Sequence, residues 1–419
     1  MSAHPKMARP RSMARLSTSQ ADPSSDAAAM LRRLGFWLLF FATPLAALFA
    51  RRAVVVLVPL AIVLLVLAAA LDGGSKLSGP LLRQGLTSPG SLAGLLLLFW
   101  AVLSLVWTPF LPEAAERLLN IVAMLLMAVA GYLALPDRMR SANLYILPVG
   151  VALTALAAIG LGLRPGMRPG AVGDLDGQSL ERGLVVLVLF VWPAITWLHS
   201  RGRNMEALAL AVAVALASLI GPTPLPLQGL AAGALVFAVT AIAPSAGVLL
   251  TGSIMAGLLL LAPLVPIVLK PLVADLLGPR ADLTTSLDVW RSIVLGEPLR
   301  LITGHGLETA LRGRFVGLLP ANAPSTILFE IWYELGLVGA AAAALVLFAA
   351  ATGSAGDRPP LVPGVMATFA TAFAFGCLGI GTAQVWWITA LVIVVLFFVA
   401  IERGQFRTKR PKATLRTGR

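Results

Sequence analysis

The sequence predicts an all-α polytopic membrane protein with about twelve transmembrane helices and one large loop outside the membrane. Of the 419 residues, 58% are hydrophobic and only 12% are charged, and the mean hydropathy is +0.89. A soluble domain is closer to half apolar and a quarter charged. The long Leu, Ala and Val runs lack the alternation of barrel strands and reach the roughly 20 residues that a helix needs to cross a bilayer. Helices are therefore predicted.

The apolar segments divide at turn residues. Proline cannot continue a helix with normal bonding, so the break at Gly221–Pro224 separates two helices within residues 205–244. The predicted spans are 34–50, 53–71, 91–110, 117–136, 143–163, 183–199, 205–221, 226–244, 247–269, 325–350, 363–382 and 384–401. The long polar interval between the ninth and tenth spans, about 270–324, is predicted to be a loop that contains short helices.

The two ends of the chain are basic tails around a single predicted membrane domain, residues 34–401. Residues 1–33 are rich in Ser, Ala and Pro and are predicted to be disordered, and residues 402–419 form the second tail. The first span is interpreted as a retained helix and not as a cleaved signal peptide, because a second span follows at once.

Basic residues in the short loops predict the orientation. Most of them fall on the side of the two tails, which places both termini in the cytoplasm and the 270–324 loop outside. Arg51 and Arg52 lie between the first two spans, on the opposite side from this excess.

The remaining composition excludes several function classes. The formal charge of +13 lies largely in tails and short loops, so it favours a membrane surface over nucleic acid as the partner. The one cysteine, Cys377, excludes disulfides, and three separated histidines give no metal-ligand cluster. No metal or cofactor is predicted.

Arginines recur in the segments that are predicted to face outward. The guanidinium group is permanently charged and suited to bidentate phosphate contacts, so the set favours an anionic ligand. The alternative is pairing with neighbours such as Glu181, Asp288 and Glu308. The arginines are Arg164, Arg168, Arg182, Arg280, Arg291, Arg300, Arg312 and Arg314.

The long loop also carries titratable candidates. His305 stands between two glycines, as a general base or as a hydrogen-bonded structural residue. Glu330 and Glu334 share one helix face, and carboxylates near membrane depth are functional candidates. A helix around Trp290 is predicted to lie on the membrane surface, with the indole as its anchor.

At these residues the chain resembles the O-antigen ligase family, which includes polymerase-like members. Glu181–Gly183 followed by Trp192 and Pro193 resembles an Arg-Gly start to a span that ends in Trp-Pro. Residues Asp288–Gly306 resemble a segment with Trp, Pro and Gly-x-Gly, and Leu328–Gly336 resembles the stretch that follows the family's histidine. The motif order and the large loop before the tenth span extend the resemblance over most of the chain.

The resemblance implies a bacterial inner-membrane enzyme that acts at the periplasmic face. Such enzymes transfer a glycan from undecaprenyl pyrophosphate to a lipid A-core or growing polysaccharide acceptor, without a metal. Arginines hold the diphosphate, and a histidine activates the acceptor hydroxyl. By analogy Arg182 binds the diphosphate, with Arg291, Arg312, Arg314 and Glu334 as further substrate-binding candidates.

The chain departs from the family pattern at the catalytic position. The family histidine falls on Ser325, and serine is not a base at neutral pH. A second family arginine falls on Ser286, and Arg291 could replace it from the next turn. Either His305 or Glu330 then serves as the base, or the chain is inactive in transfer.

Two further functions stay open from the sequence. One is a catalytically silent relative that binds a lipid-linked glycan or a partner in surface polysaccharide assembly. The other is a transporter, which is expected to have broken helices or mid-membrane charges in paired halves. The sequence shows one such break, Gly221–Pro226, without a counterpart.

Overall fold

The structure is a computed structural model that describes residues 23–73, 87–164, 178–278, 281–354, 359–381 and 384–404, and within these ranges it contains helices and connections but no strand. The elements are α1 (Pro23–Trp37), η1 (Leu38–Ala42), α2 (Thr43–Ala47), α3 (Ala53–Leu71), α5 (Pro89–Leu103), η2 (Ser104–Val106), α6 (Leu111–Ala134), α7 (Ser141–Leu144), α8 (Ile146–Leu163), α9 (Gln178–Ser200), α10 (Asn204–Leu219), α11 (Leu225–Ile242), α12 (Pro244–Leu260), η4 (Ala262–Leu264), α13 (Val265–Leu277), α14 (Asp282–Gly296), α15 (Arg300–Thr303), α16 (Thr309–Phe315), α17 (Ile327–Gly353), α18 (Val362–Cys377) and α19 (Val385–Gly404).

The predicted all-helical membrane class agrees with this architecture. Within the described ranges, nine helices are long and apolar enough to cross a membrane, or ten if the bent pair α12–α13 is one span. The apolar helices α10 and α18 are shorter. Each predicted span overlaps one of these elements, while the number of crossings, twelve, stays a prediction.

Helix α9 forms the centre of the main hydrophobic core. Nearly all of its side chains from Ser179 to Leu198 are buried, because α8, α10, α18 and α19 pack around it. A second cluster, with Trp290, Phe329 and Trp332 among its members, joins α12, α14 and α17. The fold therefore places the predicted loop region against its own separate core.

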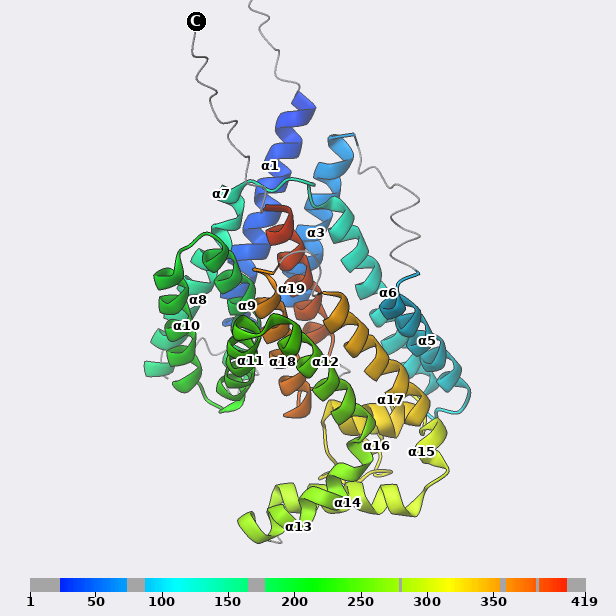
Figure 1. The fold of residues 1–419 in the computed structure, drawn as a ribbon. Helices are drawn as coiled ribbons and strands as arrows, with labels where there is room; N and C mark the ends of the chain where they lie inside the picture. The colour runs from blue at the N-terminus through cyan, green and yellow to red at the C-terminus, as the bar shows by residue number, and fades with distance from the viewer. Residues whose placement is uncertain are drawn as a thin grey trace, which may run out of the picture.

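The start of α1 and the end of α19 lie at one end of the bundle, and α13 to α16 lie at the other (Figure 1). Helix α1 begins at Pro23, so the predicted disorder of residues 1–33 is wrong for its last part. Residues 1–22 and most of the second tail, 405–419, lie outside the described ranges.

The helix around Trp290 differs from the prediction. It is α14, and it does cross the end of the bundle (Figure 1). Trp290, however, is buried and packs edge-on against Phe329 with 5.7 Å between ring centroids. The indole thus fixes α14 to the protein, and the prediction of a membrane anchor is wrong.

Candidate functional site

The candidate site is built around a break in α17. Gly336 has φ 63° and ψ −160°, which interrupts the helix between Leu335 and Leu337. A carbonyl in a helix accepts from the N–H four residues later, so the break frees the carbonyls just before it. Only glycine suits the position, since a Cβ there would lie 2.5 Å from the carbonyl oxygen of Ile302.

Segments from elsewhere in the chain satisfy these freed carbonyls. The backbone N–H of His305 donates to the Tyr333 oxygen at 2.8 Å, and that of Gly306 donates to the Glu334 oxygen at 2.9 Å. The indole Nε1 of Trp100 donates to the Leu335 oxygen at 2.8 Å. The polar backbone of the break is therefore paired inside the protein, as buried backbone groups require.

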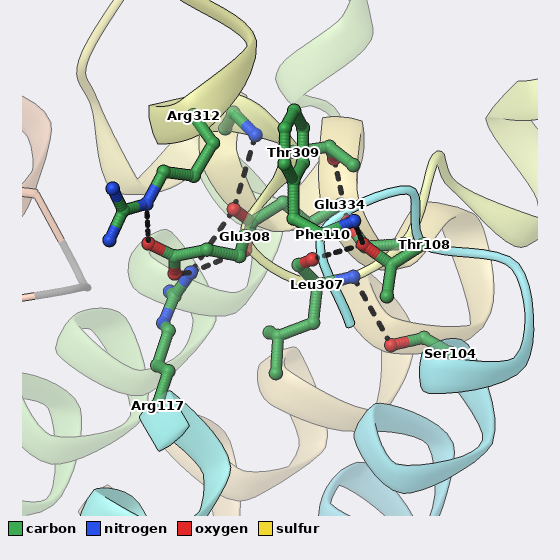
Figure 2. A network of polar contacts seen from close by, with 11 residues as sticks. Ser104, Thr108, Phe110, Arg117, Leu307, Glu308, Thr309, Arg312 and Glu334 are labelled. Carbon is green, nitrogen blue, oxygen red and sulfur yellow. Dashed lines mark hydrogen bonds and ion pairs between the residues drawn. The ribbon is translucent and has the colours of Figure 1, made fainter. Parts of the chain in front are cut away.

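The segment Gly304–Ala310 enters the protein interior beside this break. Gly304 and Gly306 have φ of 73° and 101°, and a Cβ on Gly304 would lie 2.2 Å from the Glu334 carbonyl oxygen. Thr108 Oγ1 donates to the Leu307 carbonyl at 2.8 Å (Figure 2). Part of the predicted outer loop is thus held between α6 and α17.

A buried ion cluster joins α6, the segment Gly304–Ala310 and α17. Arg117 Nη1, from α6, donates to Glu308 Oε2 at 3.0 Å and to the two Glu334 oxygens at 2.9 and 3.1 Å (Figure 2). Glu308 and Glu334 are 4% and 2% exposed. Such charges are tolerated in an interior only when they are paired, so the cluster fixes α6, α16 and α17 together.

Further contacts support the two carboxylates. The N–H of Ala310 donates to Glu334 Oε1 at 3.3 Å, and Arg312 Nε lies 3.7 Å from Glu308 Oε1. Glu308 has a positive φ of 72°, a conformation that non-glycine residues rarely adopt. The predicted pairing of Arg312 with Glu308 is therefore confirmed, whereas Asp288 pairs with Lys270 and not with Arg291.

Sequence reasoning missed Arg117, the centre of the cluster. It is the first residue of the predicted span 117–136, where a charged residue is expected at a helix boundary. An arginine inside an apolar helix, with two carboxylates on one helix face later in the chain, is the signal that could have found it.

Glu330 lies one turn before Glu334 in the half-helix Ile327–Leu335. It is 5% exposed, and a Cβ on Gly381 would lie 3.0 Å from its Oε1 atom. Its charge interacts with Arg117 and with Arg314. Burial lowers the pKa of the Arg314 guanidinium, and the carboxylates of Glu330 and Glu334 act in the opposite direction.

The start of the half-helix lies beside Arg314. Arg314 Nη2 donates to the Pro324 carbonyl at 2.6 Å, and the Thr326 side chain caps the helix by accepting from the Phe329 N–H. Ser325 Oγ would be 3.9 Å from a Cβ on Gly379. The predicted residues Ser325, Glu330 and Arg314 thus belong to one site.

His305 has a different environment from the one predicted for a base. Its Nδ1 lies 3.1 Å from the Tyr333 carbonyl oxygen and its Nε2 lies 2.9 Å from Glu297 Oε2. The ring also stacks on Tyr333 at 4.1 Å between centroids. Each ring nitrogen therefore already has a protein oxygen within hydrogen-bonding distance, so neither is open to an acceptor hydroxyl. An adjoining cavity of about 20 Å³ has room for about one water molecule.

The predicted arginines Arg182 and Arg291 lie on different helices, α9 and α14, while Arg168 and Arg280 lie outside the described residues. The Arg182 guanidinium lies 5.4 Å from the ring centroid of Trp386. Arg182 therefore lies against the start of α19, whereas Arg291 is exposed on α14.

Among the residues that the structure describes, no group of three or more His, Cys, Asp or Glu side chains could hold a metal ion. Comparisons of the chain with protein-family models, with curated proteins and with solved structures found no match.

Proposed function

We propose that this protein transfers a glycan from undecaprenyl pyrophosphate to a lipid A-core or growing polysaccharide acceptor, as O-antigen ligases and polymerases do. The observation that carries the proposal is the buried Glu330, whose charge interacts with the guanidinium groups of Arg117 and Arg314 beside a broken helix. A buried carboxylate near fixed positive charges suits a reaction that takes a proton from a hydroxyl and releases a diphosphate.

In the proposed reaction, Glu330 accepts the proton of the acceptor hydroxyl while that oxygen forms a bond to the anomeric carbon of the glycan. The bond between this carbon and the carrier diphosphate breaks, and the diphosphate leaves with the bonding electron pair. Arg182 and Arg314 neutralise its charge, which is the contribution that preorganised cations make in a dry site. Ser325 orients the acceptor by a hydrogen bond, and Glu334 acts through Arg117 on the position of the half-helix.

The proposal includes an orientation. The protein is an inner-membrane protein of a bacterium with both termini in the cytoplasm, and the α13–α16 end faces the periplasm. The excess of arginine and lysine in the short loops on the terminal side supports this orientation.

The test is glycan transfer by the full-length protein in liposomes. An undecaprenyl-pyrophosphate-linked oligosaccharide and a lipid A-core acceptor are supplied, and the products are separated by mass. Transfer that falls strongly in Arg182→Gln, but not in the exposed Arg291→Gln, supports the proposal. Binding of the lipid-linked glycan without transfer indicates a silent relative.

The breaks in the membrane helices favour a second candidate, a transporter. α17 is interrupted at Gly336, and α12 and α13 are bent by 62° at their junction. Helices α12 and α17 also pack against each other. Broken helices around a charged site are typical of transporters. Movement of an intact lipid-linked glycan across the liposome membrane, without covalent transfer, identifies this function.

A further inference from the structure

A groove lies between α9, α10 and α11, away from the candidate site. Its volume is about 450 Å³, and its lining is mostly apolar. The groove exists because α10 packs mainly on α8 and α9, whereas α11 packs mainly on α18. Ala207, Ala211 and Ala215 recur every fourth residue along the α10 wall, and their small side chains leave the space between the helices open.

One end of the groove is polar. His199 and Asn204 both line it, and His199 Nδ1 lies 2.8 Å from Asn204 Oδ1. The connection between them carries Arg201, whose guanidinium donates to the carbonyl of Gly404 at 2.9 Å. The polar end therefore belongs to the end of the bundle where α19 finishes. Arg203, next to Asn204, is about half exposed and pairs with Glu206.

The length of the groove matches one leaflet of a bilayer. Its lining follows α10 from Asn204 to Ala215, which is twelve residues and about 16 Å of helix between the first and last Cα atoms. The hydrocarbon core of a bilayer is about 30 Å thick, so one leaflet is about 15 Å deep. An acyl chain whose headgroup lies at the polar end would fill the groove to the middle of the membrane.

We propose that this groove binds one acyl chain of an anionic phospholipid, with the headgroup at His199 and Asn204. Arg201, in the connection between these two residues, supplies positive charge at this end, because its guanidinium contacts the Gly404 carbonyl and the Ser141 hydroxyl, which are both uncharged. The apolar walls would contact the acyl chain, and the positive charge at the polar end would favour an anionic headgroup. This site is independent of glycan transfer, because it lies at the opposite end of the bundle.

The experiment uses the full chain in nanodiscs of phosphatidylglycerol and phosphatidylcholine in equal parts, with native mass spectrometry of the released protein. The wild type is expected to retain one phosphatidylglycerol. Ala211→Phe fills the groove and should lower this retention on the order of tenfold. Ala209→Phe adds the same ring on the exposed face of α10 and should change nothing. Arg201→Gln should lower the preference for phosphatidylglycerol about fivefold.

Equal retention by Ala211→Phe and Ala209→Phe overturns the proposal, as does equal retention of both phospholipids by the wild type. The proposal would also be overturned if the wild type were a dimer and Ala211→Phe were a monomer, because a second copy of the protein would then occupy the groove. If Ala211→Phe does not fold, a photo-crosslinking residue at Val212 replaces it. Crosslinks to phosphatidylglycerol from Val212, but not from Leu216 outside the lining, support the site, and their absence overturns it.

Discussion

The two interrupted helices, α12–α13 and α17, are repaired in different ways. At the first, Pro263 has no N–H for the Leu259 carbonyl four residues before it, and one indole, Trp332 Nε1, donates to that oxygen at 2.6 Å. At the second, Gly336 turns the chain, and three carbonyls are paired by residues from two other segments.

The difference teaches where function can reside. The proline break is repaired locally by a side chain of a neighbouring helix, and within the described residues no buried carboxylate lies on α12 or η4. The glycine break brings a distant loop into the interior, and with it the charges of Glu308 and Arg314. The backbone of the glycine break is paired by residues from other segments, and these segments also bring charged side chains to the same place. Such a break can therefore form a charged site.

The largest effect on stability is expected from adding a side chain at Gly336, where α17 is interrupted. Gly336→Ala puts a Cβ at 2.5 Å from the Ile302 oxygen in a left-handed conformation, so the free energy of unfolding should fall by about 3 kcal/mol or more. Gly353→Ala, in the same helix with open space around it, is the control and should be neutral. Thermal stability in detergent is the measurement. Equal stability of the two variants would contradict the role given to Gly336.

The next effect concerns the ion cluster at the glycine break. Arg117→Met leaves Glu308 and Glu334 buried without their cation, and we expect a loss of about 3–5 kcal/mol in unfolding free energy. Arg203→Met removes an exposed pair and should leave the melting temperature unchanged.

A triple variant separates charge from packing at this cluster. Adding Glu308→Gln and Glu334→Gln to Arg117→Met should recover part of the stability, because the unpaired charges are gone. Were the triple variant less stable than Arg117→Met alone, the loss would come from packing and not from charge.

A smaller effect compares the two breaks directly. Trp332→Phe and Trp100→Phe each leave one carbonyl oxygen without its donor, at a cost of roughly 1–3 kcal/mol. Only Trp100→Phe disturbs the glycine break, so only this variant should also lower glycan transfer. Loss of transfer in both variants, at similar stability, would remove the distinction between the breaks.

The smallest effect is expected at the surface of the site. Glu297→Gln removes the partner of His305, but the Glu297 side chain is 59% exposed, so the stability change should stay below about 1 kcal/mol. Transfer should also be preserved. A large loss of transfer here would return His305 to the role of base.

The sequence predicted the helices well because each apolar run carries its own signal of length and composition. The predicted break at Gly221–Pro224 is confirmed between α10 and α11, because a missing donor is a property of proline itself, whereas the bend at Pro263 falls inside the predicted span 247–269 and was not predicted. Gly336 and Arg117 were not readable in the same way. Their roles depend on Ile302 and Glu308, far away in the chain, and a glycine or a boundary arginine has many possible neighbours. Trp290 was misread for a related reason, because a helical apolar face suits a protein core as well as a membrane.

The most direct test is the rate of glycan transfer by Glu330→Gln and by His305→Asn in the same liposomes. Proton acceptance by Glu330 predicts that Glu330→Gln lowers the rate by a factor of roughly 10² to 10⁴, with the melting temperature preserved. His305→Asn should stay within about tenfold of the wild type, since an amide can replace one of the two ring contacts. A Glu330→Gln protein that transfers glycan at the wild-type rate would contradict the account.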